Sequence, residues 1–341
     1  MATIVDVAKH CGVSTATVSM VLRDKGRISD KTRQRVLQAI DELGYVYNQT
    51  AANLRNQQSN QIGLLLNDIT NPFYSEMTAG LSQEMEDNDL MLFLANSEDA
   101  VARQKKFIES LLSQKAGGLV LCPAKGTDQQ FLATLKRRQL PVILAVRDIE
   151  GTDYDYVGTD NFYGGQLVTQ HLLDLGHRHI AFIGGDKASK NRASRMGGYM
   201  SKLIEHNITP QLGWLATCPA TRNGGAAAME TLLKQHPEVT AVVCYHDIVA
   251  FGAIRTLRQH QLEPGKDIAI TGFDDVPEAA DTYPALTTIS VSAREIGRRA
   301  GEALIERIRG NTEPQKRIII PPKLVIRQSC GTAVPDSASR Q

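Results

Sequence analysis

Polar side chains gather at the ends of the apolar runs that follow Gln61. Most of these runs end in a carboxylate, an amide, a guanidinium or an imidazole, at Asn67-Asp68, Asn96, Arg147-Asp148, Asp160-Asn161, His246-Asp247 and Asp274-Asp275. Such groups donate and accept several hydrogen bonds at once, as a polar ligand with many hydroxyl groups requires. If the runs are parallel strands, their carboxyl ends meet at the edge where open α/β sheets bind ligands. For any single residue, a helix N-cap explains the position equally well.

The motifs that mark catalysis are absent from the sequence. Gly-x-Ser-x-Gly, Gly-x-x-x-x-Gly-Lys-Ser/Thr and His-Glu-x-x-His do not occur. The segment 184–190 follows an apolar run but lacks the second glycine and the lysine of a phosphate loop, so an ordinary turn is expected there. His177 and His179 have no third ligand nearby, and the five cysteines are scattered. We therefore expect no catalytic residue, no metal and no cofactor.

The first stretch, Thr3–Leu22, has the pattern of two short helices joined by a turn. Thr3 and Asp6 are spaced as in a capping box, Gly12 ends the first helix, and Ser14 caps the second. The outward face of the second helix then carries Thr15, Ala16, Ser19 and Met20. This pattern predicts a helix-turn-helix whose second helix enters the DNA major groove. An ordinary helical hairpin is the alternative.

The residues after this motif add a third helix and a linker. The helix is capped at Ser29 and ends at Gly44, and the stretch 23–35 holds six basic residues against two acidic ones. This local surplus suits phosphate contacts, although the whole chain has a net charge of only +1 and a solvated face is the alternative. Residues 48–60 carry one large apolar side chain, Leu54, with little to pack against. They predict a linker that folds only when docked, with a plain tether as the alternative.

The rest of the 341 residues alternates apolar runs with amphipathic segments. This alternation predicts parallel strands covered on both faces by helices. The expected strands are 62–66, 90–94, 118–121, 142–146, 180–183, 241–244, 268–271 and 324–326. They are too many for one small sheet, so we expect an α/β core of two lobes after the all-α headpiece and a hinge helix. The expected divisions are a headpiece at 1–47, a hinge at 48–60, lobes at 61–160 with 291–323 and at 161–290 with 324–330, and a tail at 331–341.

The termini and the hydropathy predict a cytoplasmic protein. The N-terminus lacks a basic region followed by a long apolar run, and no stretch reaches about 18 apolar residues. Neither export nor a membrane partner is expected.

Taken together, these motifs resemble the LacI/GalR family of bacterial transcription regulators. The N-terminal signatures are Asp6-Val-Ala8, Gly12-Val-Ser14, Thr17-Val-Ser19, Gly44-Tyr45 and Asn48. The later signatures are Asn71-Pro-Phe-Tyr74, Gly158-Thr-Asp-Asn161, Leu175-Gly-His177, Arg195, Gly198-Tyr199, Gly272-Phe-Asp-Asp275 and Pro284-Ala-Leu-Thr-Thr288. The resemblance covers about residues 3–328 and implies a core like that of periplasmic sugar-binding proteins.

The resemblance implies which residues contact DNA. Those that face base edges are Thr15, Ala16 and Met20, and Leu54 is wedged into the minor groove. Those that position the backbone are Thr3, Ser14, Thr17, Ser19, Arg33, Arg35 and Asn48. Many family members have Arg where Met20 stands. A thioether offers only apolar contact, so the half-site is expected to depart from the commoner family pattern.

The resemblance also implies a ligand site between the lobes. Its residues are Phe73, Arg147, Asp160, Arg195, His246 and Asp274. A carboxylate accepts from two sugar hydroxyls, a guanidinium donates a planar fork, and an aromatic ring stacks on an apolar sugar face. His246 stands where the family usually has Asn, and Val146 where it often has Asp. The ligand therefore stays open between a sugar and a sugar phosphate.

The expected function is that of a repressor whose affinity for DNA is set by a small ligand. A homodimer is expected because two headpieces match a pseudo-palindromic operator in double-stranded DNA. A co-repressor-dependent regulator or an activator of the same fold is the alternative. A periplasmic sugar-binding protein has no use for residues 3–56, and an enzyme needs a catalytic constellation that the sequence lacks.

Overall fold

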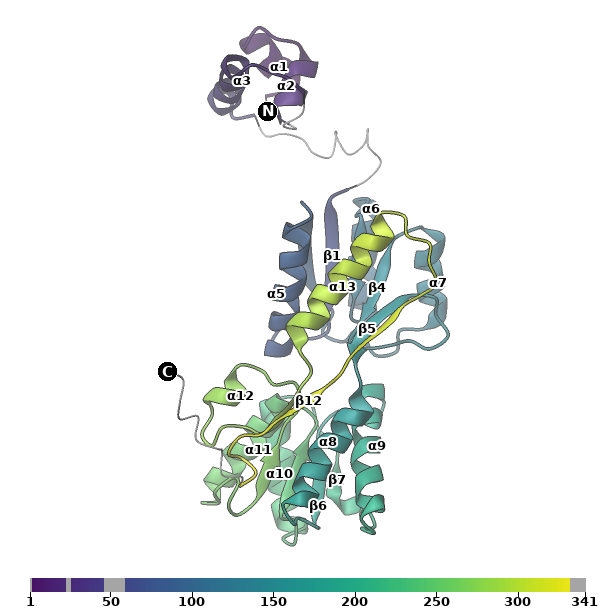
Figure 1. The fold of residues 1–341 in the computed structure, drawn as a ribbon, viewed down its shortest axis with the longest axis vertical. Helices are drawn as coiled ribbons and strands as arrows, with labels where there is room; N and C mark the ends of the chain where they lie inside the picture. Colours follow the sequence, from purple (N-terminus) through teal and green to yellow (C-terminus); the bar gives the residue numbers. More distant parts are fainter. Residues whose placement is uncertain (1, 23–25, 46–58, 332–341) are drawn as a thin grey trace. The chain divides into compact units, whose positions relative to one another are not determined.

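The computed structural model describes residues 2–22, 26–45 and 59–331. The chain divides into two compact units, Met1–Ser59 and Asn60–Gln341 (Figure 1). Leu54 and Asn48 lie outside the described residues. Within the described ranges, no helix is long and apolar enough to cross a membrane.

The described residues of the first unit form three helices, as expected: α1 (Ile4–His10), α2 (Thr15–Leu22) and α3 (Asp30–Leu43). The expected capping box is present, because Thr3 Oγ1 accepts from Asp6 N at 3.3 Å and Asp6 Oδ2 accepts from Thr3 N at 2.9 Å. Ser14 Oγ likewise accepts from Thr17 N at the start of α2. The helices pack around a small core whose fully buried members are Val7, Val18 and Val36.

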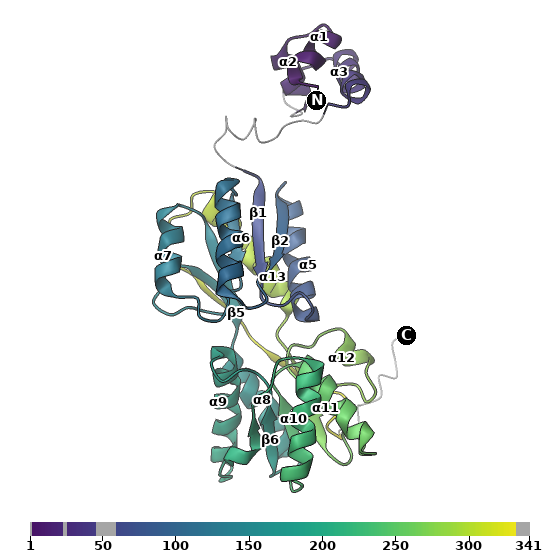
Figure 2. The same ribbon diagram turned by 180° about the vertical axis from the view of Figure 1, so that it is seen from behind.

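The first lobe of the second unit is a parallel sheet. In its described part, six strands lie in the order β11-β5-β4-β3-β1-β2. Their bounds are β1 Gln61–Leu66, β2 Met91–Asn96, β3 Gly118–Leu121, β4 Val142–Ala145, β5 Asp155–Thr159 and β11 Arg317–Ile320. Helices α5 (Pro72–Glu86) and α13 (Ala293–Ile308) cover one face, and α6 (Val101–Ser113) and α7 (Gln129–Arg137) cover the other (Figures 1 and 2). Both faces are buried, which explains why β3 and β4 are apolar throughout.

The second lobe repeats this arrangement on a smaller sheet. Its described parallel strands lie in the order β7-β6-β8-β9, beside an antiparallel pair, β10 and β12. Their bounds are β6 Ile180–Ile183, β7 Leu215–Ala216, β8 Ala241–Cys244, β9 Ala269–Thr271, β10 Thr288–Ser290 and β12 Lys323–Val325. The larger helices are α8 (Asn161–Asp174), α9 (Lys190–Glu205), α10 (Arg222–Gln235) and α11 (Asp247–Gln259), and η1 (Leu212–Trp214) and α12 (Glu278–Asp281) are short.

Glycine lets α8 and α9 pack closely beside the cleft between the lobes. A Cβ on Gly165 would lie 2.1 Å from the carbonyl oxygen of Arg195, which no real contact allows. The backbone that carries Arg195 is therefore held directly against α8. A side chain larger than hydrogen at Gly165 would displace it.

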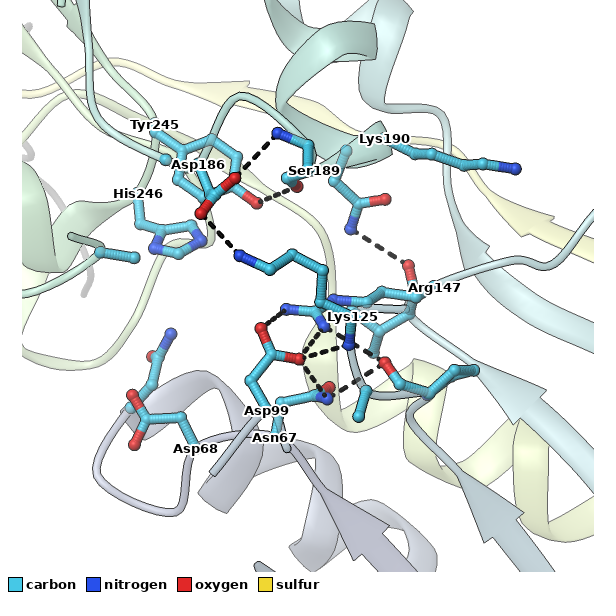
Figure 3. Close-up of a pocket in the computed structure, with 18 of the residues that line it drawn as sticks. Asn67, Asp68, Asp99, Lys125, Arg147, Asp186, Ser189, Lys190, Tyr245 and His246 are labelled. Atoms are coloured by element: carbon cyan, nitrogen blue, oxygen red, sulfur yellow. Dashed lines mark hydrogen bonds and ion pairs between the residues drawn. The ribbon is translucent and has the colours of Figure 1, made fainter. Parts of the chain in front are cut away.

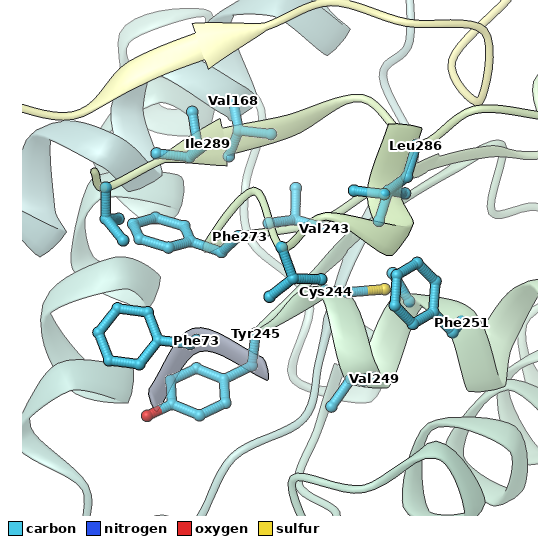
Figure 4. Close-up of a cluster of buried hydrophobic side chains, with 14 of the residues drawn as sticks. Phe73, Val168, Val243, Cys244, Tyr245, Val249, Phe251, Phe273, Leu286 and Ile289 are labelled. Carbon is cyan, nitrogen blue, oxygen red and sulfur yellow. The ribbon is translucent and has the colours of Figure 1, made fainter. Parts of the chain in front are cut away.

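Within residues 59–331 the chain passes between the lobes three times. The connections are β5 to α8, β10 to α13, and β11 to β12. All the expected strands are present with small shifts at their ends, whereas β5, β7, β10 and β11 were not expected. The buried core of the second lobe reaches the junction, where Phe73, Tyr245 and Phe273 belong to one apolar cluster (Figure 4).

Candidate functional site

A cavity of about 1020 Å³ lies between the two lobes of the second unit, where the carboxyl ends of their strands face each other (Figure 3). Such a volume is at the upper end of the ~300–1,000 Å³ typical of ligand pockets. The first lobe contributes Asn67, Phe73, Asp99, Lys125 and Arg147, among others, and the second contributes Asp186, Ser189, Arg195, Tyr245, His246 and Asp274. The structure thus brings together five of the six residues expected to bind ligand.

Arg195 on α9 is fixed in this wall by several partners. Its Nε donates to Asn161 Oδ1 at 2.8 Å, and Nη1 donates to the carbonyl oxygen of Tyr245 at 2.5 Å. The guanidinium carbon lies 3.6 Å from the ring centroid of Phe273. The residue is only 5 % exposed. Arg195 therefore enters the cavity in one orientation, with its Nη2 toward Asp274.

Asp274 faces Arg195 across a longer gap. Its Oδ1 lies 3.6 Å from Arg195 Nη2, and the residue is 6 % exposed. Its backbone adopts a φ of 120°, which is costly for a residue other than glycine, and is held there by a hydrogen bond from its N–H to the Ile289 carbonyl. Burial raises the pKa of Asp274 from 3.8 to about 8, and Arg195 opposes this shift. The ion-pair partner that the structure gives this carboxyl group is Arg195, at a distance beyond that of an ordinary hydrogen bond.

His246 carries an unused polar atom into the same wall. It occupies the N-cap of α11, yet its side chain makes no capping bond, and among the described residues its buried Nδ1 has no hydrogen-bond partner. The ring centroid lies 4.0 Å from that of Tyr245. Burial, and then the positive charges of Arg195 and Arg147, hold the pKa of His246 well below 6.5. The imidazole is therefore neutral, with one nitrogen free for a ligand.

On the opposite wall, Arg147 is held by the first lobe itself. Its Nη1 and Nη2 both donate to the carboxylate of Asp99, and Nη1 also donates to the Pro123 carbonyl at 3.2 Å. Asn67 donates to the same carboxylate at 3.3 Å and accepts from the Tyr74 hydroxyl at 3.1 Å. This network shapes the wall and leaves the guanidinium already paired.

The structure places Phe73 in the cavity wall, whereas Asp160 is not among the described lining residues. Phe73 lines the cavity from the first turn of α5, where Asn71 Oδ1 accepts from its N–H at 3.0 Å. Asp160 is not among the described residues that line the cavity. Its exposed carboxylate accepts from Tyr163 N at 2.9 Å as the N-cap of α8. In place of the expected ligand contact, the structure gives Asp160 the capping role that was its alternative.

Three contacts across the cleft were not anticipated from the sequence. Lys125 Nζ lies 2.6 Å from Asp186 Oδ2, Lys190 Nζ lies 3.4 Å from Glu150 Oε1, and Asn191 Nδ2 donates to the Val146 carbonyl at 3.2 Å. We call these three contacts the cross-cleft clasp. Its second-lobe members come from the turn at 184–190 and the start of α9, so that turn has a role in joining the lobes.

The residues expected to contact DNA lie on the first unit. Thr15, Ala16 and Met20 are exposed on α2, whereas Ser19 is half-buried. Thr3 and Ser14 are occupied as helix caps, and the Ser14 and Thr17 hydroxyls lie 2.9 Å apart. On α3, Arg35 is exposed and Arg33 is half-buried. The outward face predicted for the second helix is thus confirmed for its three base-facing candidates.

Comparisons with known proteins match both units. Residues 3–48 match the model of bacterial regulatory proteins of the lacI family, and residues 59–328 match that of periplasmic binding proteins and the sugar-binding domain of the LacI family. The maltose regulon regulatory protein MalI of Escherichia coli K12 is 36% identical over 95% of this chain and 97% of its own. The ribose operon repressor of Haemophilus influenzae is 31% identical over 96% of this chain and 98% of its own.

Solved structures agree with these relatives. A Lac repressor dimer bound to operator and the anti-inducer ONPF is similar with a TM-score of 0.85 at 26% identity, covering 96% of this chain and 99% of that one. The transcriptional regulator CelR in complex with cellobiose is similar with a TM-score of 0.74 at 27% identity, covering 96% and 100%. This chain therefore belongs to the LacI family, and it is a DNA-binding regulator of transcription under the control of a ligand.

Proposed function

We propose that the chain is a repressor that binds a pseudo-palindromic operator as a homodimer and releases it when a sugar occupies the cavity between the lobes. The observation that carries the proposal is the buried pair of Arg195 and Asp274 in a cavity built by both lobes. The relatives support it, since one is named as a ribose operon repressor and another structure holds cellobiose. Co-repression, with the opposite sign of response, is the second candidate.

The same proposal assigns a role to each segment of the chain. Residues 1–47 form the headpiece, 48–60 the hinge, 61–330 the ligand-binding core and 331–341 a tail. Within the core, one lobe takes 61–160 with 291–323 and the other 161–290 with 324–330. The protein acts in the cytoplasm without catalysing a reaction, in keeping with relatives that are transcription regulators.

The geometry suits a compound with several hydroxyl groups. The Asp274 carboxyl group accepts from one ligand hydroxyl and, while it holds its proton, donates to a second oxygen, Arg195 Nη2 donates to a third oxygen, and His246 Nδ1 pairs with a further hydroxyl. Phe73 offers an aromatic face at the cavity wall. Arg195 and Asp274 are buried and already held in place, and among the described residues His246 Nδ1 has no hydrogen-bond partner. A ligand hydroxyl can therefore pair with polar atoms that the fold has already desolvated.

Ligand binding changes DNA affinity only through a difference between two closures of the lobes. A sugar that touches both lobes favours one closure, and the coupling that results is typically about 1–3 kcal/mol. We propose that closure alters the spacing of the two linkers in the dimer, and with it the seating of both Leu54 side chains in the operator. Leu54 itself lies outside the described residues.

The experiment compares wild type with Asp274→Ala. Operator binding is measured by fluorescence anisotropy on DNA from upstream of the gene, with and without maltose, cellobiose or ribose, and sugar binding by calorimetry. We expect the wild type to respond to at least one sugar, and Asp274→Ala to bind operator equally well but to ignore that sugar.

The matched control is Asp153→Ala, which removes an exposed carboxylate paired with Lys136 on the surface. It should respond to sugar as the wild type does. Unchanged sugar affinity in Asp274→Ala would remove this residue from the site. Sedimentation tests the dimer, and a stable monomer at micromolar concentration contradicts it.

A further inference from the structure

The cavity wall carries charges of both signs. Its cations are Lys125, Arg147, Lys187, Lys190 and Arg195, and its carboxylates are Asp68, Glu98, Asp99, Asp148, Asp186 and Asp274. A phosphate group needs several donors for its oxygens and at least one cation that is not already neutralised. Whether these cations are free therefore decides between a sugar and a phosphorylated sugar.

The two first-lobe cations are paired. Arg147 gives two of its nitrogens to the carboxylate of Asp99, and one of these also bonds the Pro123 carbonyl. Lys125 places its ammonium 2.6 Å from Asp186. Binding a phosphate to either cation requires breaking an ion pair and leaves a carboxylate beside the phosphate oxygens. The like charges then repel each other.

Arg195 already has partners for several of its polar groups. Nε and Nη1 are used by Asn161 and by the Tyr245 carbonyl, and the plane is covered by the Phe273 ring. Of its five N–H donors, one on Nε and one on Nη1 are therefore used, and Nη2 lies 3.6 Å from the Asp274 carboxyl group. A guanidinium edge that is shared with a carboxyl group suits a hydroxyl group better than a phosphate.

The remaining cations lie toward the mouth of the cleft. Lys190 pairs with Glu150 at 3.4 Å. Lys187 is exposed and pairs with no carboxylate in residues 59–331. One flexible ammonium in water gives weak, salt-screened attraction and does not make a phosphate site.

Helix N-termini at the cleft are also occupied. Ser189 Oγ accepts from Arg192 N at the start of α9, and Asn71 Oδ1 accepts from Phe73 N at the start of α5. At α11 the buried carboxylate of Asp247 lies in the first turn. At α9 and at α5 one backbone amide is therefore already capped, and at α11 the Asp247 carboxyl group in the first turn disfavours an anion at the amides that bind phosphate in other α/β proteins.

We propose that the cavity, whose volume is about 1020 Å³, takes an uncharged polyhydroxy ligand larger than one sugar ring and rejects the phosphorylated form of the same sugar. This proposal rests on the proposed function, since it specifies the ligand of the same cavity. The neutral polar groups of the wall, with Asp274 as an acceptor, meet hydroxyl groups. Arg147 and Lys125 are paired with carboxylates of the chain, and two of the five N–H donors of Arg195 are already used. A phosphate would be desolvated without new partners, which is costly.

The first arm of the test uses matched pairs of probes on the full chain. These are maltose and maltose 6′-phosphate, cellobiose and cellobiose 6′-phosphate, and ribose and ribose 5-phosphate, each measured by calorimetry. For any pair that binds, we expect the phosphorylated member to bind at least about tenfold more weakly, or about 1.4 kcal/mol. Equal or tighter binding of the phosphorylated member overturns the proposal, as does ribose binding more tightly than both disaccharides.

The second arm uses inorganic phosphate and does not depend on knowing the sugar. Wild type is expected to show no saturable phosphate binding, whereas Asp99→Asn frees the part-buried guanidinium of Arg147 and should bind phosphate. Asp153→Asn frees the surface Lys136 instead and serves as the matched control. Saturable binding to wild type that is lost in Arg147→Met overturns the proposal. So does a failure of Asp99→Asn, once a thermal melt shows that it is folded, to bind phosphate better than the control.

The two arms separate this proposal from the proposed function. If no neutral sugar binds or alters operator affinity, the proposed function fails. The phosphate titrations still decide whether the cavity excludes a doubly charged anion.

Discussion

The burial of Asp274 predicts that the core loses stability as the pH rises from 6 to 8. Burial raises the pKa of this carboxyl from 3.8 to about 8 in the folded chain. Between these two values the folded state holds a proton that the unfolded state has lost. Unfolding therefore releases a proton, and the free energy of unfolding falls as the pH rises through this window. The perturbation is Asp274→Asn, which keeps the shape and removes the titration.

The size of the effect follows from the same two pKa values. Integrating the proton difference for Asp274 from pH 6 to pH 8 gives a loss of about 2 kcal/mol in the free energy of unfolding. Asp247 is also buried and has its pKa raised to about 6. It contributes about 0.4 kcal/mol over this range and more below it. The Asn variant should lose the Asp274 contribution and keep those of the other groups, among them Asp247 and also His246, whose lowered pKa makes the free energy of unfolding rise with pH.

The assay is urea unfolding of the full chain at pH 6, 7 and 8. The free energy of unfolding is taken from the transition of the core. Asp153→Asn is the matched control, because Lys136 holds the pKa of Asp153 below its usual value and its carboxylate stays ionised throughout the range. We expect the control to follow the wild type. A slope in Asp274→Asn equal to that of the wild type would show that Arg195 keeps Asp274 ionised in the fold and would refute the argument.

Further predictions address the clasp and the DNA. Lys125→Met and Asp186→Asn should each change sugar affinity by less than about fivefold, since exposed ion pairs are worth about 0.2–1 kcal/mol, and the double variant should add nothing in calorimetry. Arg35→Ala should reduce the slope of log affinity against log salt by about one without changing sequence preference in anisotropy titrations. Leu54→Ala should weaken operator binding by a few kcal/mol at most and leave the core's melting temperature unchanged. Met20→Arg should shift selected binding sites toward guanine in the half-site, and an unchanged preference would remove α2 from base contact.

The fold was predictable where hydrophobicity alone decides structure. The buried strands that were predicted are short apolar runs, and their apolar composition alone predicts burial on both faces. They are β1, β3, β4, β6 and β8. Strand β5 was missed because it begins with Asp155, a buried charge that Arg307 Nε satisfies at 2.6 Å. The partner, Arg307, lies on α13 and is far from Asp155 in the sequence, so the local sequence does not predict the pair. Strand β11 was missed because it is a half-exposed edge.

The site was predictable where a side chain lies within three residues after the end of a strand. Arg147, His246 and Asp274 follow β4, β8 and β9 and line the cavity. Asp99 and Lys125 come from irregular loops, so their place in the wall depends on tertiary contacts that spacing does not encode. Asp160 also follows a strand, but the carboxylate turns back to cap its own helix.

At positions 146 and 246 the chain has other residues than those that the resemblance implies, and both differences alter the polarity of the cavity wall. His246 presents a neutral imidazole, and Val146 presents a backbone carbonyl that Asn191 already occupies. Val146 is held at a φ of 67°, which a β-branched residue adopts only when its surroundings impose it. The lobe junction therefore uses the Val146 backbone to hold the lobes together, where an acidic side chain would be free to bind ligand. We therefore propose that Arg195, Asp274 and His246 of the second lobe carry most of the ligand recognition. A ligand that fills the cavity must add contacts to the first lobe beyond the clasp, because only such contacts can distinguish one closure from another.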